Sequence, residues 1–327
     1  MVLGQQWKQL SMQNFAITGV AGYIAPRHLE AIISTGNRIV AALDPHDSVG
    51  ILDRYCPQAR FFPEPERFDR HLEKLRRKSE EKRVHWMSVC APNYLHDAHI
   101  RMAFRVGADV ICEKPLVLNP WNLDALKQLE EETGCRVWSV LQLRLHPTIL
   151  ALRKRILESG SKEKYDIVLT YITPRGPWYL RSWKGSMERA GGLATNIGIH
   201  FFDMLLWIFG AVEENQVHIS EPTRCAGHLE LERARVRWYL SIDRNDSPLL
   251  NENNEPCTYR TIKINGEELE FTSGFTGLHT KLYQQTLAGS GFGIEDVRPS
   301  IQIIHDIREA SPTGTGENSH SFALKKG

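Results

Sequence analysis

The first 140 residues alternate short apolar segments with amphipathic ones, and this alternation restricts the fold more than any other feature. The apolar segments predict strands at 15–18, 38–43, 83–91, 108–112 and 136–141. Amphipathic patterns between them predict helices at 25–34, 68–78, 96–106 and 122–133. Strands that alternate with helices indicate an α/β domain with a parallel, doubly wound sheet and right-handed crossovers.

The pattern changes after Arg144. Longer β-rich segments follow at 165–173, 233–243, 259–264 and 269–272, and 247–257 is a polar loop. Asn265-Gly266 lies between two of these segments and is typical of a type I′ hairpin turn. The second half is therefore predicted to be an α+β domain with an open, largely antiparallel sheet. We divide the chain into a tail at 1–13, a first domain at 14–142 and a second domain at 143–327; the motifs below predict dinucleotide binding for the first and substrate binding for the second, and the resemblance stated below implies oligomerisation through the second.

Composition excludes several classes of function. A chain of 327 residues fits two domains of ordinary size. A net charge of +1 gives no electrostatic basis for binding nucleic acid or an anionic membrane. We see no apolar stretch long enough to span a bilayer, no signal-peptide pattern, and no CxxC pairing among six cysteines. These features favour a protein of the reducing cytoplasm.

A glycine-rich segment, GVAGYIA at 19–25, directly follows the first strand and opens a helix. Small residues there let the backbone approach a pyrophosphate at the helix N-terminus. The spacing is GxxGxxA rather than GxGxxG, so a tight strand–helix turn without a ligand is the alternative. The residues of this turn predicted to contact a dinucleotide are Gly19, Ala21, Gly22, Tyr23 and Ile24.

Asp44 ends the second strand, 25 residues beyond Gly19. A carboxylate at that place accepts hydrogen bonds from the adenosine ribose hydroxyls and repels a 2′-phosphate. No arginine follows it directly, so NAD is favoured over NADP.

Two further strand ends carry polar residues. Glu113-Lys114-Pro115 places a lysine at the mouth of the predicted cofactor domain, where its ammonium faces the nicotinamide. Asn93 can offer an amide to the nicotinamide side. The predicted cofactor contacts beyond the glycine turn and Asp44 are Pro92, Asn93, His96, Glu113, Lys114, Gln142 and Trp183.

His96 and His99 lie three residues apart near a helix start. Apart from Asp97, no carboxylate or thiol completes a ligand set at metal spacing. A histidine pair on the helix surface is the preferred interpretation, and no metal is predicted.

Asn196, His200 and Asp203 share one side of a strongly apolar helix, at spacings of four and three. Polar groups in such a helix are costly unless they face a cleft or are fully hydrogen-bonded. The stripe therefore predicts a catalytic cleft, with a satisfied core histidine as the alternative.

Glu113-Lys114-Pro115, Gly191-Gly192 and this helix together resemble the Gfo/Idh/MocA oxidoreductase family. Longer strings resemble, within it, the dehydrogenases of UDP-N-acetylglucosaminuronate in bacterial O-antigen synthesis. These strings are GYIAPRH at 22–28, PNYLHDAH at 92–99, LQLRLHP at 141–147 and TNIGIHFFD at 195–203. The resemblance runs from about residue 14 to about residue 312, and the long strings are more specific than the short motifs.

The resemblance implies NAD-dependent oxidation of the C3 hydroxyl of UDP-N-acetyl-D-glucosaminuronic acid to the 3-keto sugar. It also implies a homotetramer, a pyridoxal-phosphate aminotransferase that takes the product, and, as in some relatives, reoxidation of the nicotinamide by 2-oxoglutarate. The wider family usually has Asp where this chain has Asn196, and an amide cannot raise the basicity of the histidine.

His200 and Lys114 are the predicted catalytic residues. We favour neutral His200 as the base, with Lys114 hydrogen-bonded to the developing alkoxide. The reverse assignment is open, because a lysine beside a positively charged nicotinamide has a lowered pKa.

An acidic UDP-sugar requires cationic and amide donors. The predicted substrate-binding residues are Lys114, Arg144, Arg175, Tyr179, Lys184, Thr195, Asn196 and His200. Two rival readings are a relative that acts on another sugar or an inositol, and an NAD-binding regulator without catalysis.

Overall fold

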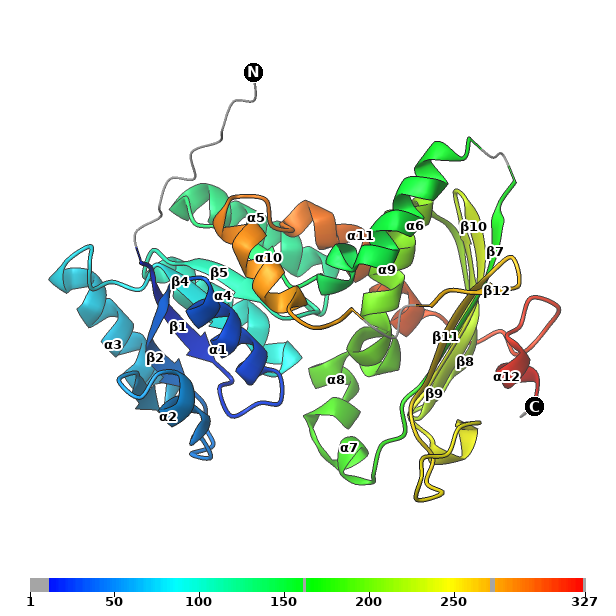
Figure 1. The fold of residues 1–327 in the computed structure, drawn as a ribbon, viewed down its shortest axis with the longest axis horizontal. Helices are drawn as coiled ribbons and strands as arrows, with labels where there is room; N and C mark the ends of the chain where they lie inside the picture. Colours follow the sequence, from blue (N-terminus) through cyan, green and yellow to red (C-terminus); the bar gives the residue numbers. More distant parts are fainter. Residues whose placement is uncertain (1–11, 161–162, 271–273, 326–327) are drawn as a thin grey trace.

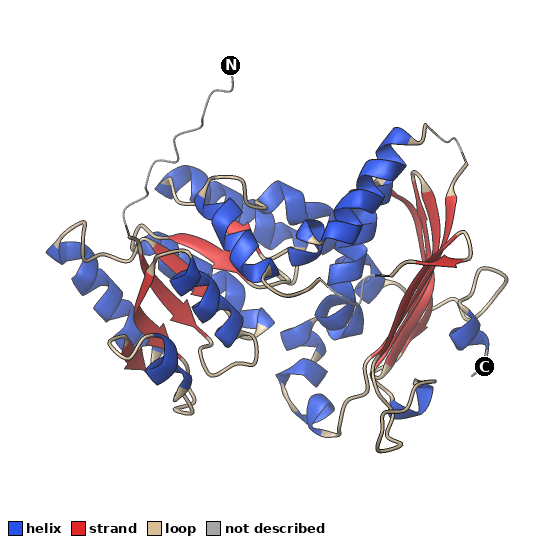
Figure 2. Ribbon diagram, in the orientation of Figure 1, coloured by secondary structure: helices blue, strands red, loops and turns tan. Residues whose placement is uncertain are grey.

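The computed structural model describes residues 12–160, 163–270 and 274–325. Two sheets stand at opposite ends of the molecule, with most of the helices between them (Figure 1). The helices and strands are shown by type in Figure 2. The first eleven residues of the predicted N-terminal tail lie outside the described part.

The first sheet is parallel throughout, in the order β3-β2-β1-β4-β5-β6. Its strands are β1 Asn14–Thr18, β2 Arg38–Leu43, β3 Arg60–Phe62, β4 Trp86–Val89, β5 Asp109–Cys112 and β6 Val137–Ser139. The prediction of a doubly wound parallel sheet is confirmed. The strand order reverses between β1 and β4, and ligands of such sheets bind beyond the carboxyl ends of the strands at that point.

Five helices accompany this sheet in the described residues, and four of them lie where amphipathic patterns predict a helix. The five are α1 Ala25–Ser34, α2 Ile51–Tyr55, α3 Pro65–Lys78, α4 His96–Arg105 and α5 Pro120–Thr133. Two elements were not predicted, β3 and α2. Each spans only three to five residues, which is too short to show a hydrophobic period.

The second sheet is mixed, in the order β12-β11-β7-β10-β9-β8. Only β7 and β10 pair in parallel, so the largely antiparallel sheet is confirmed. Its strands are β7 Tyr165–Ile172, β8 Val212–Ser220, β9 Arg224–Leu231, β10 Ala234–Ser241, β11 Tyr259–Ile264 and β12 Glu267–Glu268. Strands β8 and β9 were not predicted; β8 is largely polar and exposed or half-buried, which hides its period.

The hairpin turn between β11 and β12 has the predicted geometry, because Asn265 and Gly266 both adopt positive φ, 50° and 85°. The strand predicted at 269–272 is not found at 269–270, and its remaining two residues lie outside the described part. The loop at 247–257 has one isolated bridge, between Leu250 and Pro256.

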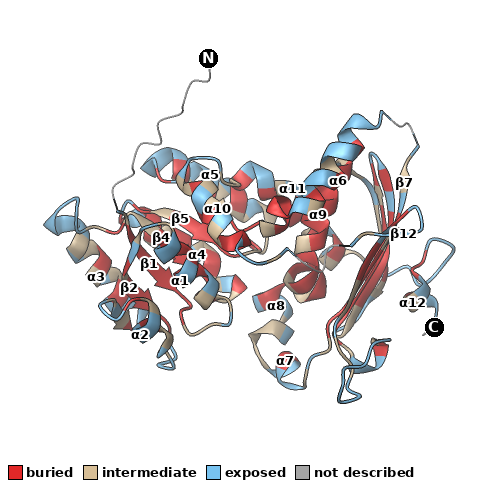
Figure 3. Ribbon diagram, viewed as in Figure 1, coloured by how far each residue is buried: buried red, intermediate tan, exposed pale blue. Residues whose placement is uncertain are grey.

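Helices cover the inner face of the second sheet. They are α6 Pro147–Glu158, α9 Ile199–Phe209 and α11 Ile294–Glu309, with short α7 Trp178–Arg181 and α8 Met187–Ala190 before α9. Short α12 Ser321–Leu324 lies on the outer face (Figure 1). Figure 3 shows α9 buried almost throughout, and Phe202 packs edge-on against Trp238 of β10.

Helix α10, Leu278–Leu287, returns from the second half of the chain and packs on α1. Its Tyr283 is fully buried, with its ring centroid 6.1 Å from that of Phe15 in β1. The C-terminal third of the chain thus contributes side chains to the first sheet's core. The boundary at 142/143 stays a prediction.

One stretch in the described residues, Met187–Phe209, is long and apolar enough to cross a membrane, contrary to our reading of the sequence. Its most apolar window is 67% buried inside the protein. Its hydrophobicity is therefore accounted for by the core around α9.

Candidate active site

The glycine-rich turn between β1 and α1 passes against the end of β4. Gly19 has a φ of +76°, and a Cβ on it would lie 2.4 Å from the carbonyl oxygen of Cys90. The Gly22 amide donates to the Gly19 carbonyl at 3.0 Å, which closes the turn. Only glycine fits at position 19, for reasons of both conformation and space.

Gly19→Ala is therefore expected to displace the turn and weaken NAD binding by tenfold or more, about 1.4 kcal/mol or more. Gly36→Ala is the matched control, because Gly36 has a φ of +77° but no atom within 4 Å of its Cβ position. The control should show only the backbone strain of about 1–2 kcal/mol in thermal unfolding. Calorimetric titration with NAD measures the difference, and equal affinities for the two variants would contradict the role of Gly19.

Asp44 is buried at the carboxyl end of β2 and is attached to the same turn. Its Oδ2 accepts a hydrogen bond from the Ala21 amide at 3.0 Å, and Oδ1 accepts one from His46 at 2.9 Å. A carboxylate has about four acceptor positions, so it can still accept from ribose hydroxyls. Beside it Tyr23 is 88% exposed and Ile24 is half-buried, at the opening of the turn.

The residues that follow β4 connect the two halves. Asn93 is buried and donates from Nδ2 to the carbonyl of Ala190, at the end of α8, at 3.2 Å. Pro92, immediately before it, is half-buried. The predicted cofactor contact of Asn93 stays a prediction, and the structure adds a link to the substrate half.

The interpretation of His96 and His99 as a surface pair is wrong, because both are buried. His96 lies between the carbonyl oxygens of Ala91 and Pro115, at 2.8 and 2.7 Å, and so connects the loops after β4 and β5. Since both its ring nitrogens have partners, His96 positions these loops, and its predicted cofactor contact stays a prediction. His99 pairs with Thr18 Oγ1 at 2.9 Å, and burial lowers its pKa to about 4.

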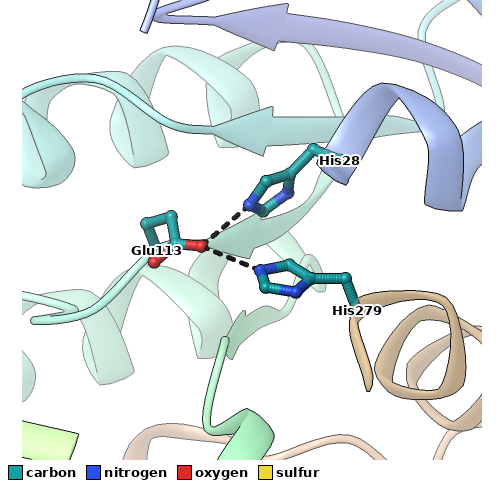
Figure 4. A group of neighbouring side chains, drawn as sticks. All are labelled: His28, Glu113 and His279. Atoms are coloured by element: carbon teal, nitrogen blue, oxygen red, sulfur yellow. Dashed lines mark hydrogen bonds and ion pairs between the residues drawn. The ribbon is translucent and has the colours of Figure 1, made fainter. Parts of the chain in front are cut away.

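Glu113, at the end of β5, is buried and lies between two imidazoles from distant helices (Figure 4). Its Oε1 lies 2.9 Å from His28 Nε2 of α1 and 3.4 Å from His279 Nε2 of α10. Burial alone would raise the pKa of Glu113, but the hydrogen bonds and charges of these two histidines outweigh it and lower the pKa well below its usual value. The side-chain atoms of His28, Glu113 and His279 that could bind a metal ion lie within 4.8 Å of one another. Hydrogen bonds account for these contacts, and we assign no metal.

The side chain of Lys114 links the first half of the chain to the second. Its Nζ donates to the backbone carbonyl of Asn196 at 3.1 Å. Burial lowers the pKa of Lys114, the charge of Glu113 raises it, and the charge of Lys184 lowers it further, with a lowered pKa as the result. The amine is therefore more easily deprotonated than a surface lysine.

His200 lies in the first turn of α9, directly after the π-helical turn Ala194–Gly198 that contains Asn196. Such turns occur often at functional sites. Burial, and then the charge of Lys114, lower the pKa of His200 well below its usual value. Within the described chain no hydrogen bond occupies its imidazole, so a neutral ring is free to accept a proton.

The predicted stripe on α9 is divided by the structure. Asn196 lies with Lys114 at the cleft side, and its amide donates to the hydroxyl of buried Tyr179. Asp203 instead forms a buried ion pair with Arg144: the Nε–Oδ2 and Nη2–Oδ1 distances are 2.9 and 2.7 Å.

Arg144 is thus held on several sides. Besides Asp203, it donates to the Asp296 carbonyl at 2.8 Å and lies over the rings of Trp207 and Phe292. Because a buried carboxylate needs a paired cation, this guanidinium stabilises the fold. Its predicted substrate contact stays a prediction, although these partners already occupy much of the guanidinium.

Lys184 and Arg175 form a cationic pair near Tyr179. Lys184 Nζ lies 5.4 and 5.6 Å from the ring centroids of Trp178 and Trp183. Burial and then the charge of Arg175 lower the pKa of Lys184. Among the residues described, no carboxylate pairs with either cation. The site therefore has positive charge available for an anionic ligand.

Two buried side-chain atoms near these loops lack a partner in the described part of the chain, Gln142 Oε1 and Thr195 Oγ1. Buried polar atoms are normally hydrogen-bonded. With the glycine turn and the carboxylate of Asp44, the unpartnered amide of Gln142 fits a bound dinucleotide. Thr195 fits a substrate contact on the other side.

The sequence reasoning missed His28, His279 and Tyr283. They come from α1 and α10, which no periodic pattern connects. His28 ends one of the strings of the resemblance, and that was the only sequence feature that could have drawn attention to it.

Two family models match the chain. A Gfo/Idh/MocA model described as an oxidoreductase family with an NAD-binding Rossmann fold matches residues 13–140. The C-terminal alpha/beta domain of the same oxidoreductase family matches residues 163–285.

Solved structures agree with the models. The WlbA (WbpB) dehydrogenase of Thermus thermophilus, in complex with NAD and alpha-ketoglutarate, is 50% identical with a TM-score of 0.90, over 95% of this chain and 100% of that chain. The same protein in complex with NAD and UDP-GlcNAcA gives a TM-score of 0.89. WlbA of Bordetella pertussis, at 18% identity and a TM-score of 0.72 over 90% of this chain and 94% of that one, shows the same fold.

Curated relatives match over shorter segments. The inositol 2-dehydrogenase of Rhizobium meliloti is 26% identical over 122 residues, 37% of this chain and 36% of that protein. The chain spans 36% to 59% of the length of three other curated relatives.

Proposed function

The chain belongs to the Gfo/Idh/MocA family of NAD-dependent oxidoreductases, and we propose that it oxidises the C3 hydroxyl of UDP-N-acetyl-D-glucosaminuronic acid to the 3-keto sugar. The contact of Lys114 Nζ with the Asn196 carbonyl carries this proposal. It brings an amine from the first half of the chain beside the helix turn that bears His200. The relative from Thermus thermophilus, 50% identical, is described in complex with this same sugar nucleotide.

Oxidation of a secondary alcohol removes a hydride from carbon and a proton from oxygen. Bound NAD supplies the hydride acceptor. His200, neutral because of its lowered pKa, takes the hydroxyl proton and becomes imidazolium, which later releases that proton to solvent. Lys114 donates a hydrogen bond to the same oxygen as negative charge develops on it. The reverse assignment, with Lys114 as the base, is also consistent with its lowered pKa.

An acidic sugar nucleotide carries a diphosphate and a carboxylate, and Arg175 and Lys184 can neutralise part of that charge. We expect Arg175→Ala and Lys184→Ala each to raise KM for UDP-N-acetylglucosaminuronate by about 10- to 100-fold, since charged hydrogen bonds contribute about 1.5–3 kcal/mol. The analogue UDP-N-acetylglucosamine keeps the diphosphate but lacks the carboxylate, so its binding affinity should fall less in the variant that removes the partner of the carboxylate.

Lys164→Ala is the control for these variants, because Lys164 pairs with Glu213 and Glu230 on the second sheet. Steady-state kinetics measure all three. Unchanged KM in both Arg175→Ala and Lys184→Ala would remove these cations from the substrate site.

The function itself is tested by anaerobic incubation of the purified protein with sugar candidates, following the absorbance of reduced nicotinamide. UDP-N-acetylglucosaminuronate should give reduction, and UDP-N-acetylglucosamine and myo-inositol should not. Addition of 2-oxoglutarate should reverse the signal if the nicotinamide stays bound and is recycled. Turnover of myo-inositol instead would favour the inositol reading, and NAD binding without any turnover would favour a regulator.

The remaining parts of the proposal concern the setting of the reaction. We propose a cytoplasmic homotetramer in O-antigen nucleotide-sugar synthesis, whose keto product passes to a pyridoxal-phosphate aminotransferase. The six cysteines are all free thiols, which agrees with a reducing compartment.

A further inference from the structure

A chain of hydrogen bonds lies beneath Lys114, in the core between β4, β5, α1 and α10. Ser88 Oγ lies 2.6 Å from Tyr283 Oη, which lies 2.7 Å from His28 Nδ1. His28 Nε2 and His279 Nε2 then converge on Glu113 Oε1, as Figure 4 shows. All five side chains are buried.

The acceptors determine where the protons are. An ionised carboxylate only accepts, so both imidazoles present an Nε2–H to Glu113. Burial lowers the pKa of His28, against the hydrogen bond and the charge of Glu113, and this favours a neutral ring. The Nδ1 of a neutral His28 accepts from the Tyr283 hydroxyl, which in turn accepts from Ser88. The negative charge of this chain lies on Glu113, because the interactions with the two histidines outweigh burial and hold its pKa well below its usual value.

This charge lies next to the backbone of Lys114. The second oxygen of Glu113 accepts from the backbone amide of Lys114 at 3.3 Å. Its charge raises the pKa values of both Lys114 and His200, against burial and against neighbouring cations. A buried carboxylate is costly, so a fold that needed only a connection between α1 and α10 could use neutral groups there.

Resting on the proposed function, we propose that Glu113, held by His28 and His279, is a positioning residue whose fixed negative charge sets the proton affinity of Lys114 and His200. The carboxylate touches neither the reacting sugar nor its hydroxyl in this assignment. It acts on the reaction through the two groups that do.

The other titratable groups around Lys114 act in known directions. Lys184, from the turn before α8, lowers the pKa of Lys114. Burial lowers the pKa of His96 of α4, against the hydrogen bonds to the Pro115 and Ala91 carbonyls. Burial also raises the pKa values of Cys90, Cys112 and Tyr283, which keeps these groups neutral. Glu113 is thus the negative charge among the described groups that act on Lys114.

The test uses the intact protein without substrate. Acylation of Lys114 by an amine-reactive ester, followed by mass spectrometry as a function of pH, reports when this amine loses its proton. In Glu113→Gln the midpoint should move to lower pH by about one unit or more, because a nearby opposite charge shifts a pKa by about that much. A folded Glu113→Gln protein with an unchanged midpoint would overturn the proposal.

Glu130→Gln is the matched control. Glu130 is also a buried glutamate of the first half; its Oε1 accepts from the Val137 amide and its other oxygen pairs with Arg136, away from Lys114. In Glu130→Gln the pH midpoint for acylation of Lys114 should equal that of the unmodified protein. An equal shift in this control would show a general effect of losing a buried carboxylate, and would also overturn the proposal.

Substitution of His279, which donates a hydrogen bond to Glu113, tests the proposal a second way in case Glu113→Gln does not fold. His279→Gln keeps an N–H that can donate to Glu113, whereas His279→Leu removes it. The Leu variant should weaken the hold on the ionised carboxylate and change the pH profile of kcat/KM, and the Gln variant should largely restore it. Equal profiles for the two variants contradict the role of the hydrogen bond.

The outcomes separate this inference from the proposed function. If UDP-N-acetylglucosaminuronate is not oxidised, the function fails, while the labelling of Lys114 still decides whether Glu113 acts on it. The purified protein could instead contain one equivalent of metal that is lost in Glu113→Gln. That result would show a metal site in place of the hydrogen-bonded arrangement, and it would contradict this inference without affecting the proposed function.

Discussion

Replacement of Lys114 or His200 by alanine is expected to lower kcat/KM for UDP-N-acetylglucosaminuronate by about 10²–10⁴-fold, because each variant removes a positioned proton-transfer or hydrogen-bonding group. The reason is structural as well as chemical. The amine from the loop after β5 reaches the Asn196 carbonyl, four residues before His200 on the same helical segment. Steady-state kinetics with thermal unfolding separate lost chemistry from lost folding.

The lowered pKa of His200 also predicts how activity should change with pH. Since burial and the charge of Lys114 lower the pKa of His200, its imidazole is neutral throughout the neutral range and gains a proton only at acidic pH. Activity that depends on His200 as a base should therefore persist below pH 6.5, the usual pKa of histidine, and fall only at lower pH.

Lys281→Ala is the control for the lysine. Lys281 also contacts a backbone carbonyl, that of Leu145 at 3.5 Å, but from α10. It should retain near-normal turnover. Near-normal turnover in Lys114→Ala and in His200→Ala would refute the catalytic assignment.

Replacement of Arg144 by alanine is expected to lower the free energy of unfolding by about 3–5 kcal/mol, because it leaves the carboxylate of Asp203 buried without its cationic partner. Burial already raises the pKa of Asp203, against the effect of Arg144. The lost contacts with Trp207 and Phe292 add to the cost. Urea unfolding measures the change, with the slope compared between variants to detect any loss of two-state behaviour.

A double variant distinguishes the ion pair from simple loss of volume. Arg144→Met with Asp203→Leu removes both charges and keeps apolar bulk, and should recover much of the stability. Arg153→Ala is the comparison variant, since Arg153 also lies over the ring of Trp207, 4.3 Å from its centroid, and is half-buried. If Arg144→Ala unfolds like the unmodified protein but raises KM, that result would support the substrate contact predicted from the sequence.

The sequence by itself determined the features that local chemistry encodes. The strand–helix alternation predicted the parallel sheet, because side-chain periodicity depends only on neighbours along the chain. The glycine turn predicted a conformation that only glycine adopts at Gly19, and Asn265-Gly266 predicted its hairpin in the same way. Lys114 and His200 could be selected because each stands at the end of an apolar segment or within one, where a polar group needs a reason.

Only the tertiary structure decided which polar groups serve the site and which serve the fold. His28 and His279 are 85 and 166 positions from Glu113, and no local pattern connects them. Arg144 looked available for an anionic ligand until the fold placed Asp203 against it. Burial and charge pairing arise from contacts between distant segments, so the role of a polar side chain depends on what the folded chain brings to it.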